Sequence, residues 1–145
     1  MKKIILLFTG LIVLLNSCTP EEPIPLNPSA PNLISPANEE TCLDGISIND
    51  SQSNVEFRWS SAANTISYEL VVTNLLTQSS QIFPSTSNQT TVALSKSEPY
   101  NWSVKSFGEV GSVPSQSIQW KFYLAGDAIV NYAPFPAELI SPQSG

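Results

Sequence analysis

Short stretches of alternating apolar and polar residues constrain the fold of this chain more than any other feature. Val55-Glu56-Phe57-Arg58-Trp59 alternates without a break, which places Val55, Phe57 and Trp59 on one face of an extended strand. After residue 18, no stretch keeps the three- and four-residue apolar spacing of an amphipathic helix over several turns. The pattern therefore predicts an all-β fold.

The same period of two recurs in runs separated by Ser, Asn, Pro and Gly. We expect strands at residues 67–73, 90–94, 100–107 and 116–123, and a weaker one at 81–83. In the run at 116–123, Ile118, Trp120 and Phe122 share the predicted inward face. The main core residues predicted in this way are Trp59, Tyr68, Leu94, Tyr100, Trp102 and Trp120. Strands that are apolar on one face are typical of two antiparallel sheets packed face to face.

Several of these runs carry a family resemblance that covers the chain from about Pro31 to Leu124. The motifs are Val55-x-Phe57-x-Trp59, Tyr68-Glu69-Leu70-Val71-Val72, Leu94 placed six residues before Tyr100, Asn101-Trp102-Ser103-Val104, and Ser117-Ile118-Gln119-Trp120. Together they resemble a fibronectin type III domain. The resemblance implies an immunoglobulin-like antiparallel sandwich of about seven strands, in which the Tyr100 hydroxyl bonds back across the corner between strands E and F. It implies little about a ligand.

One segment departs from the family pattern. Residues 37–54, which would join the first two strands, are unusually numerous. They contain Asp44-Gly45 between Leu43 and Ile46, a sequence that predicts a local hairpin. We therefore expect a small extra hairpin at this point.

The first eighteen residues predict export and lipid attachment. Lys2 and Lys3 precede an apolar run at residues 4–15, which is shorter than the roughly 20 residues that a spanning helix needs. Leu15-Asn16-Ser17-Cys18 resembles a bacterial lipobox, in which a peptidase cuts before the cysteine and acyl chains are attached to it. We expect residues 1–17 to be a signal peptide and Cys18 to be the acylated anchor to a membrane. The alternative is an ordinary secretory signal with a coincidental cysteine.

Residues 18–32 predict a stalk behind this anchor. Residues 19–32 hold five prolines, which favour an extended chain that could span roughly 40 Å. Glu21 and Glu22 closely follow Cys18, and such acids resemble a surface-export signal of some Gram-negative lineages. We expect a lipid-anchored protein of the bacterial cell envelope, on the outer membrane. An extracellular and a periplasmic face both remain open.

The layout beyond the stalk predicts one domain and the beginning of another. We assign residues 33–125 to the fibronectin type III-like domain and residues 126–145 to a linker and the truncated start of a second repeat. Leu33-Ile34-Ser35-Pro36 recurs as Leu139-Ile140-Ser141-Pro142, at a spacing that suits a sandwich domain plus a linker. The chain is therefore expected to belong to an array or to be a piece of a longer protein.

Charge and residue usage exclude several classes of function. Removing Lys2 and Lys3 with the signal moves the formal net charge from −6 to −8, which argues against nucleic acid and anionic lipid headgroups as partners. The chain has no His, so Ser-His-Asp and Cys-His catalysis and imidazole zinc sites are excluded. With Cys18 acylated, Cys42 has no disulfide partner, and we expect it to be a small packed hydrophobe rather than a reactive thiol.

Two surface regions are candidate sites. Oxygen ligands gather at Glu39, Glu40, Asp44, Asn49 and Asp50, which we interpret as a solvated loop, with a calcium site as the alternative. No metal and no cofactor are predicted. The second region is the turn after residue 106, where apolar residues lie beside two glycines, and its candidate contact residues are Phe107, Val110 and Val113. The alternative is that these side chains fold back onto the sandwich.

Three functional hypotheses are compatible with this sequence. The expected one is a non-catalytic module on a cell-envelope lipoprotein, acting as a spacer or by contact with another protein. The second is a carbohydrate-binding accessory lipoprotein that would stack sugars on Phe107, Tyr123, Tyr132 or Phe135. The third is the amino-terminal fragment of a larger surface enzyme.

Overall fold

The computed structural model describes residues 23–126. The predicted signal peptide, Cys18, Tyr132, Phe135 and the second copy of the repeat lie outside the described residues. The described part forms ten strands and no helix. The strands are β1 (Leu33–Ser35), β2 (Glu40–Leu43), β3 (Ile46–Asn49), β4 (Gln52–Trp59), β5 (Ser67–Asn74), β6 (Ser80–Ser85), β7 (Gln89–Ser95), β8 (Glu98–Phe107), β9 (Ser115–Gln116) and β10 (Trp120–Leu124).

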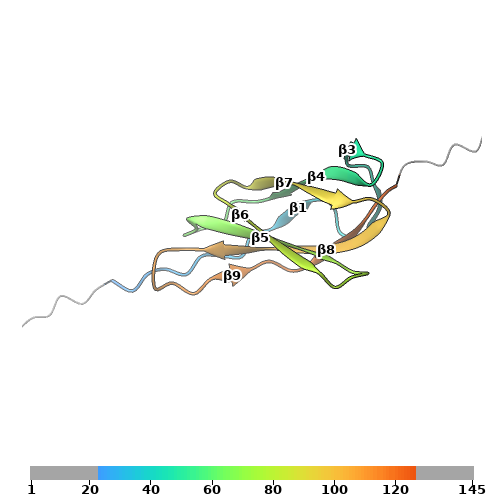
Figure 1. The fold of residues 1–145 in the computed structure, drawn as a ribbon. Coiled ribbons are helices and arrows are strands. Elements are labelled where there is room, and N and C mark those ends of the chain that lie inside the picture. Colours follow the sequence, from blue (N-terminus) through green and yellow to red (C-terminus); the bar gives the residue numbers. More distant parts are fainter. Residues whose placement is uncertain (1–22, 127–145) are drawn as a thin grey trace, which may run out of the picture.

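The strands form two sheets that lie one above the other (Figure 1). In the four-stranded sheet, β1 and β3 pair with one edge of β4 and β7 pairs with the other. The six-stranded sheet has the order β2-β10-β8-β5-β6, and β9 also pairs with β8. All pairs are antiparallel except β2 with β10, which is parallel. The prediction of an all-β fold with two sheets is confirmed.

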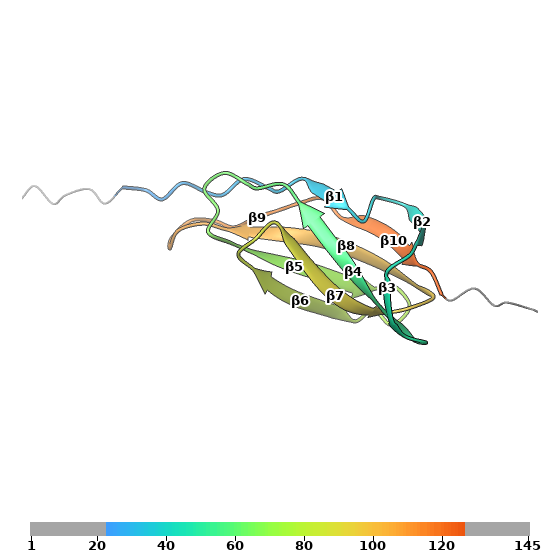
Figure 2. The same ribbon diagram turned by 90° about the horizontal axis from the view of Figure 1, so that it is seen from above.

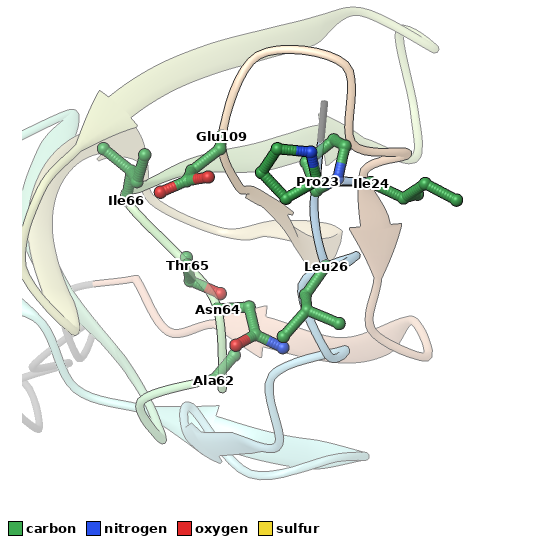
Figure 3. Close-up of a pocket in the computed structure, with 9 residues that line it drawn as sticks. Pro23, Ile24, Leu26, Ala62, Asn64, Thr65, Ile66 and Glu109 are labelled. Carbon is green, nitrogen blue, oxygen red and sulfur yellow. The ribbon is translucent and has the colours of Figure 1, made fainter. Parts of the chain in front are cut away.

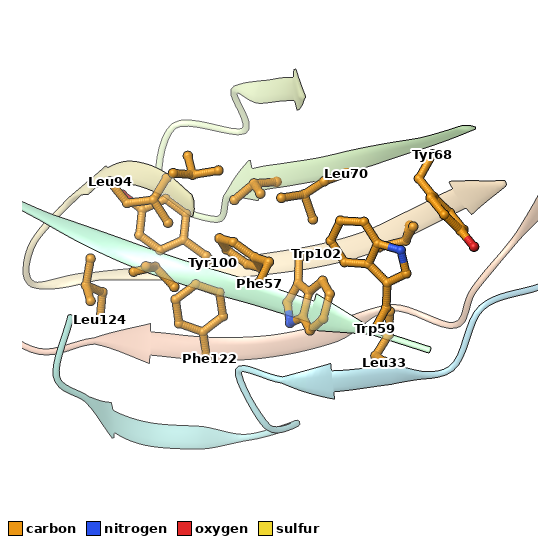
Figure 4. Close-up of a cluster of buried hydrophobic side chains, with 14 residues drawn as sticks. Leu33, Phe57, Trp59, Tyr68, Leu70, Leu94, Tyr100, Trp102, Phe122 and Leu124 are labelled. Atoms are coloured by element: carbon orange, nitrogen blue, oxygen red, sulfur yellow. The ribbon is translucent and has the colours of Figure 1, made fainter. Parts of the chain in front are cut away.

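The core lies between the sheets and comes from the inward faces of the alternating strands. Trp59, Tyr68, Leu94, Tyr100 and Trp102 are all buried, on the predicted faces of β4, β5, β7 and β8. Figure 4 shows aromatic rings from both sheets interleaved along the sandwich. The ring of Trp59 meets that of Tyr68 edge to face at 5.6 Å, a geometry that aromatic quadrupoles favour.

The predicted hairpin at Asp44-Gly45 is wrong. β2 before it belongs to the six-stranded sheet and β3 after it to the four-stranded sheet, so the chain crosses between layers here. A Cβ on Gly45 would lie 2.8 Å from the Asn54 backbone oxygen and 2.8 Å from Ser53 Cβ. Glycine is therefore needed for a close approach to β4 rather than for a hairpin turn.

Cys42 is exposed, which contradicts the prediction of a packed hydrophobe. Phe122 of β10 pairs with Glu40, and Leu124 pairs with Leu43. Between these two pairs β2 has one residue more than β10. Such a bulge breaks the strict alternation of a strand. Leu43 thereby packs against the core, and Cys42 faces solvent on an edge strand.

A similar irregularity breaks the last predicted strand into β9 and β10. Gln116 pairs with Lys105 and Trp120 with Trp102, so this strand uses one residue more than β8. Ser117 fills the gap, because its Oγ accepts a hydrogen bond from the Val104 amide at 2.9 Å. The phase shifts at this point: Ile118 is 71% exposed, contrary to prediction, and Trp120 is half-buried, packed edge-on against Trp102.

The predicted stalk is shorter than its sequence indicates, because residues 27–32 lie along the sandwich. The Ser29 amide donates to the Ala63 carbonyl at 3.0 Å, and the buried Ser106 hydroxyl donates to the Ser29 carbonyl at 2.7 Å. Asn32 exchanges two further hydrogen bonds with Ser60. This part of the proline-rich segment therefore belongs to the folded domain.

The described chain enters and leaves the molecule at opposite ends. Figures 1 and 2 show an elongated sandwich, with the blue amino-terminal segment at one end and the red end of β10 at the other. We call the first end the amino-terminal pole; it comprises residues 23–26, the β4–β5 loop at 60–66 and the β8–β9 loop at 108–114. The opposite pole carries the β2–β3 crossover and the β7–β8 corner.

Candidate functional site

The amino-terminal pole carries a cavity of about 420 Å³ between three segments that are distant in sequence. Residues 23–26 form one wall, and residues 62 and 64–66 form the other. Figure 3 shows Glu109, from the β8–β9 loop, reaching over the opening beside Ile66 and Pro23, while Leu26 faces Asn64. The cavity is therefore a product of tertiary assembly.

The β8–β9 loop is shaped by its two glycines. A Cβ on Gly108 would lie 2.8 Å from the Asn64 carbonyl oxygen and 2.8 Å from Ser112 Oγ. Gly111 has φ +91°, a backbone conformation that side chains disfavour. The Ser112 amide and hydroxyl both donate to the Glu109 carbonyl, at 3.0 and 2.7 Å. The loop is thus a hydrogen-bonded turn in close contact with its neighbours.

Asn27 ties the amino-terminal segment to both loops of the pole. Its Oδ1 accepts a hydrogen bond from the Val113 amide at 2.8 Å, and its carbonyl accepts one from Asn64 Nδ2 at 3.2 Å. The buried Pro28 lies one residue further on, beside Gly108. The three segments of the pole therefore hold one another in place.

Five apolar side chains of the pole face solvent. They are Ile24, Leu26, Ile66, Val110 and Val113, and the exposed fraction rises from 62% at Ile66 to 101% at Val110. Of the residues that the structure describes, Glu109 is the only charged one that lines the cavity. We call the five exposed apolar side chains the apolar rim. Its two valines do not fold back onto the sandwich, so that alternative for Val110 and Val113 is wrong.

The structure separates Phe107 from the two valines that accompany it in the sequence pattern. Phe107 ends β8, where it pairs with Ser67 and is half-buried. Lys105 Nζ lies 5.3 Å from the centre of its ring, a cation–π contact. Phe107 lines a different cavity, of about 440 Å³, together with Tyr68 and Pro84.

Sequence reasoning missed Ile24, Leu26 and Ile66. Two of them lie in the proline-rich segment, which predicted an extended stalk, and Ile66 precedes β5 in a polar loop. The available signal was two large apolar residues between the prolines of a supposedly solvated linker. Only the packing of residues 27–32 on the sandwich brings them beside the β8–β9 loop.

The acidic residues proposed as calcium ligands are not brought together. Glu39 Oε1 lies 3.3 Å from Lys121 Nζ, and Glu40 Oε2 accepts the Ala37 amide at 2.9 Å. Asn49 Oδ1 is occupied by the amide and hydroxyl of Ser51. Within residues 23–126, no three His, Cys, Asp or Glu side chains are grouped to hold a metal ion.

Tyr100 anchors a polar corner at the opposite pole. Its hydroxyl donates to the Ser95 carbonyl and to Glu98 Oε2, each at 3.0 Å, and Asn74 Nδ2 also donates to Glu98 Oε2. Burial, together with the hydrogen bond and charge of Glu98, raises the pKa of Tyr100 from 10.0 to about 12, against an opposing effect of Ser95. A hydroxyl so far from titration at neutral pH serves to join β7 to β8.

Tyr123 is the most exposed aromatic side chain of the described range, at 40%. It lines a shallow, open cavity of about 430 Å³ with Lys121, Glu39 and Pro99. The tryptophans are buried or, for Trp120, half-buried. A single partly exposed ring is a small platform for sugar stacking.

Between residues 23 and 126 there is no helix long and apolar enough to cross a membrane. No protein-family model matches the chain, and no curated protein is similar to it.

Proposed function

We propose that this chain is an acyl-anchored lipoprotein of the bacterial cell envelope. Its mature part displays a non-catalytic fibronectin type III-like module that acts as a spacer or by contact with another protein. The observation that carries the proposal is a sequence pattern: Lys2-Lys3, then a short apolar run, then Cys18, all ahead of the folded sandwich. Two or more acyl chains on Cys18 would suffice for stable membrane attachment.

The fibronectin type III-like assignment is supported by the strand order and by one side-chain bond. β1, β4 and β7 share one sheet, while β10, β8, β5 and β6 are neighbours in the other. Tyr100, six residues after Leu94, donates its hydroxyl to the Ser95 carbonyl across the β7–β8 corner. This is the position and role of the tyrosine corner in sandwiches of this class.

The spacer role is supported by the shape of the domain. The two ends of the described chain lie at opposite poles (Figure 1). The length of the domain therefore separates the membrane anchor from any group attached after Gly126. Because the chain has no His, the commonest general acid and base is missing. The buried tyrosine and the hydrogen-bonded acids described above serve structural contacts, which favours a non-catalytic role.

The anchor is tested by Cys18→Ala, with Cys42→Ala as the matched control. In cells fed a palmitate analogue, we expect the wild type and Cys42→Ala to be labelled and to fractionate with membranes. Cys18→Ala should lose the label and leave the membrane fraction, because the acylated thiol is gone. Equal labelling of Cys18→Ala and wild type would refute the anchor.

A further inference from the structure

We propose that the amino-terminal pole is a membrane-contact surface, and that its apolar rim rests on the same bilayer that holds Cys18. The rim consists of Ile24, Leu26, Ile66, Val110 and Val113, all exposed. The inference rests on the proposed acylation of Cys18. It adds a specific occupant for the rim: the lipid surface itself.

The length of chain outside the described structure argues for this occupant. Pro23 follows Cys18 by only five positions, a distance of about 16 Å in extended polyproline-like chain. The tether cannot draw on the rest of the proline-rich segment, since Asn27 and Ser29 are hydrogen-bonded to the sandwich. An acylated Cys18 would therefore keep the pole within reach of the bilayer at all times.

The chemistry of the pole suits the interfacial region of a bilayer. Val110 lies at the tip of the β8–β9 turn and is fully exposed, and Ile24 is 87% exposed. In Figure 3 the side chain of Ile24 points away from the cavity. The free energy falls when apolar side chains at such a tip leave water for the boundary of the acyl region. Among residues 23–126, Glu109 is the only charged residue that lines the cavity, and its negative charge favours zwitterionic over anionic lipid at the pole.

The contact would fix the orientation of the domain relative to the bilayer. With the amino-terminal pole on the bilayer, the opposite pole, where β10 ends, points away from it (Figure 2). A second copy of the chain or another protein could also cover an apolar rim. The short tether favours the bilayer over both, because it holds the rim beside the lipid at a high effective concentration.

The test uses the full acylated protein in phosphatidylcholine vesicles containing a small fraction of nitroxide-labelled lipid. One environment-sensitive fluorophore is placed on Val110→Cys in a Cys42→Ser background. In the matched control, the same fluorophore is placed on native Cys42, which is exposed on β2. The lipid quencher should reduce emission at position 110 at least about twofold more than at position 42. Emission at position 110 should also shift to shorter wavelength when vesicles are added.

The readouts separate failure of this inference from failure of the anchor. An acylated Cys18 is blocked, so each protein takes up one fluorophore and floats with the vesicles. Two fluorophores per protein, or loss of flotation, would refute the anchor. One fluorophore with full flotation, but equal lipid quenching at both positions, would overturn the membrane contact. Protection of position 110 from a water-soluble quencher without lipid quenching would assign the rim to a protein instead, and would also overturn it.

A charge substitution provides a second test, with the fluorophore on Val113→Cys in the Cys42→Ser background. Val110→Asp places a carboxylate at the tip of the turn and should abolish most lipid quenching at position 113. Ile82→Asp is the matched control, because Ile82 is equally apolar and 60% exposed but lies on β6, away from the pole. Both variants should still float with the vesicles. Loss of quenching in both, or in neither, would contradict a membrane contact at the pole.

Discussion

The interior of the sandwich and its amino-terminal pole both gather apolar side chains, but in opposite environments. The interior side chains are buried between two sheets, on strands whose alternating sequence predicts that they are buried. The apolar side chains of the pole are exposed and come from three separate segments. The interior cluster stabilises the fold, whereas the exposed one can stabilise only a complex. Substitutions at the two places should therefore separate folding from contact.

The largest effect should come from Trp59→Ala in the interior. Trp59 is almost fully buried and packs edge-on against Tyr68. Truncating a buried aromatic leaves a cavity, so we expect the free energy of unfolding to fall by about 3–5 kcal/mol. Urea unfolding followed by circular dichroism would measure it. A loss below about 0.5 kcal/mol would mean that burial in the interior is not what stabilises this domain.

Tyr100→Phe should have the next largest effect, and one that depends on pH. Removing the hydroxyl takes a donor from the Ser95 carbonyl and leaves Glu98 Oε2 with only the hydrogen bond from Asn74, so we expect the free energy of unfolding to fall by about 0.5–3 kcal/mol at neutral pH. The pKa of Tyr100 is raised to about 12 in the folded state. The contribution of the Tyr100 hydroxyl to the free energy of unfolding should therefore be complete below pH 10 and disappear as the pH rises to about 12.

Unfolding of wild type and Tyr100→Phe at several values between pH 8 and pH 12 would check this. The free energies of unfolding of the two proteins should converge above pH 10. In this range Tyr100 ionises in the unfolded wild type before it does so in the folded one, and its ionisation stabilises the unfolded state. Comparing the two proteins cancels the titration of residues that they share. A constant difference across this range would show that the Tyr100 hydroxyl is not coupled to folding.

Ser106→Ala tests the boundary between interior and pole. The Ser106 hydroxyl is fully buried and reaches the carbonyls of Ser29 and Ser115, at 2.7 and 3.1 Å. We expect the free energy of unfolding to fall by about 0.5–1.5 kcal/mol, because the carbonyls of Ser29 and Ser115 lose the hydrogen bond from this buried hydroxyl. Hydrogen exchange should also quicken at the Ser29 amide, which bonds to Ala63. Unchanged exchange there would mean that residues 27–32 are held by their other contacts alone.

The smallest effect on stability should come from the double change Val110→Ser and Val113→Ser. Both side chains are already exposed, so the free energy of unfolding should stay within about 0.5 kcal/mol of wild type. Urea unfolding is again the measurement. A larger loss would show that the apolar rim packs against the sandwich and is part of its core.

The alternating sequence by itself determined the main strands and the packed faces of the interior. The predicted bounds of β4, β5, β7 and β8 lie close to the observed ones, and Phe57 and Trp102 meet across the sandwich as their phases require. A strand inside a sheet has only two faces, so its alternation leaves little choice about which one is buried. Sequence also supplied the apolar tip of the β8–β9 loop, because apolar residues beside two glycines are a local pattern.

Tertiary structure alone decided the edges and the rest of the apolar rim. Asp44-Gly45 carries a hairpin signal, yet its neighbours pair with different sheets, because the partners of an edge strand lie elsewhere in the chain. One extra residue reverses the phase at Ile118, and another leaves Cys42 exposed. The proline-rich segment follows the sandwich because Asn27 and Ser29 find partners in loops more than 30 residues away. Such contacts depend on the folded neighbours rather than on local spacing, so no pattern within the segment itself could predict them.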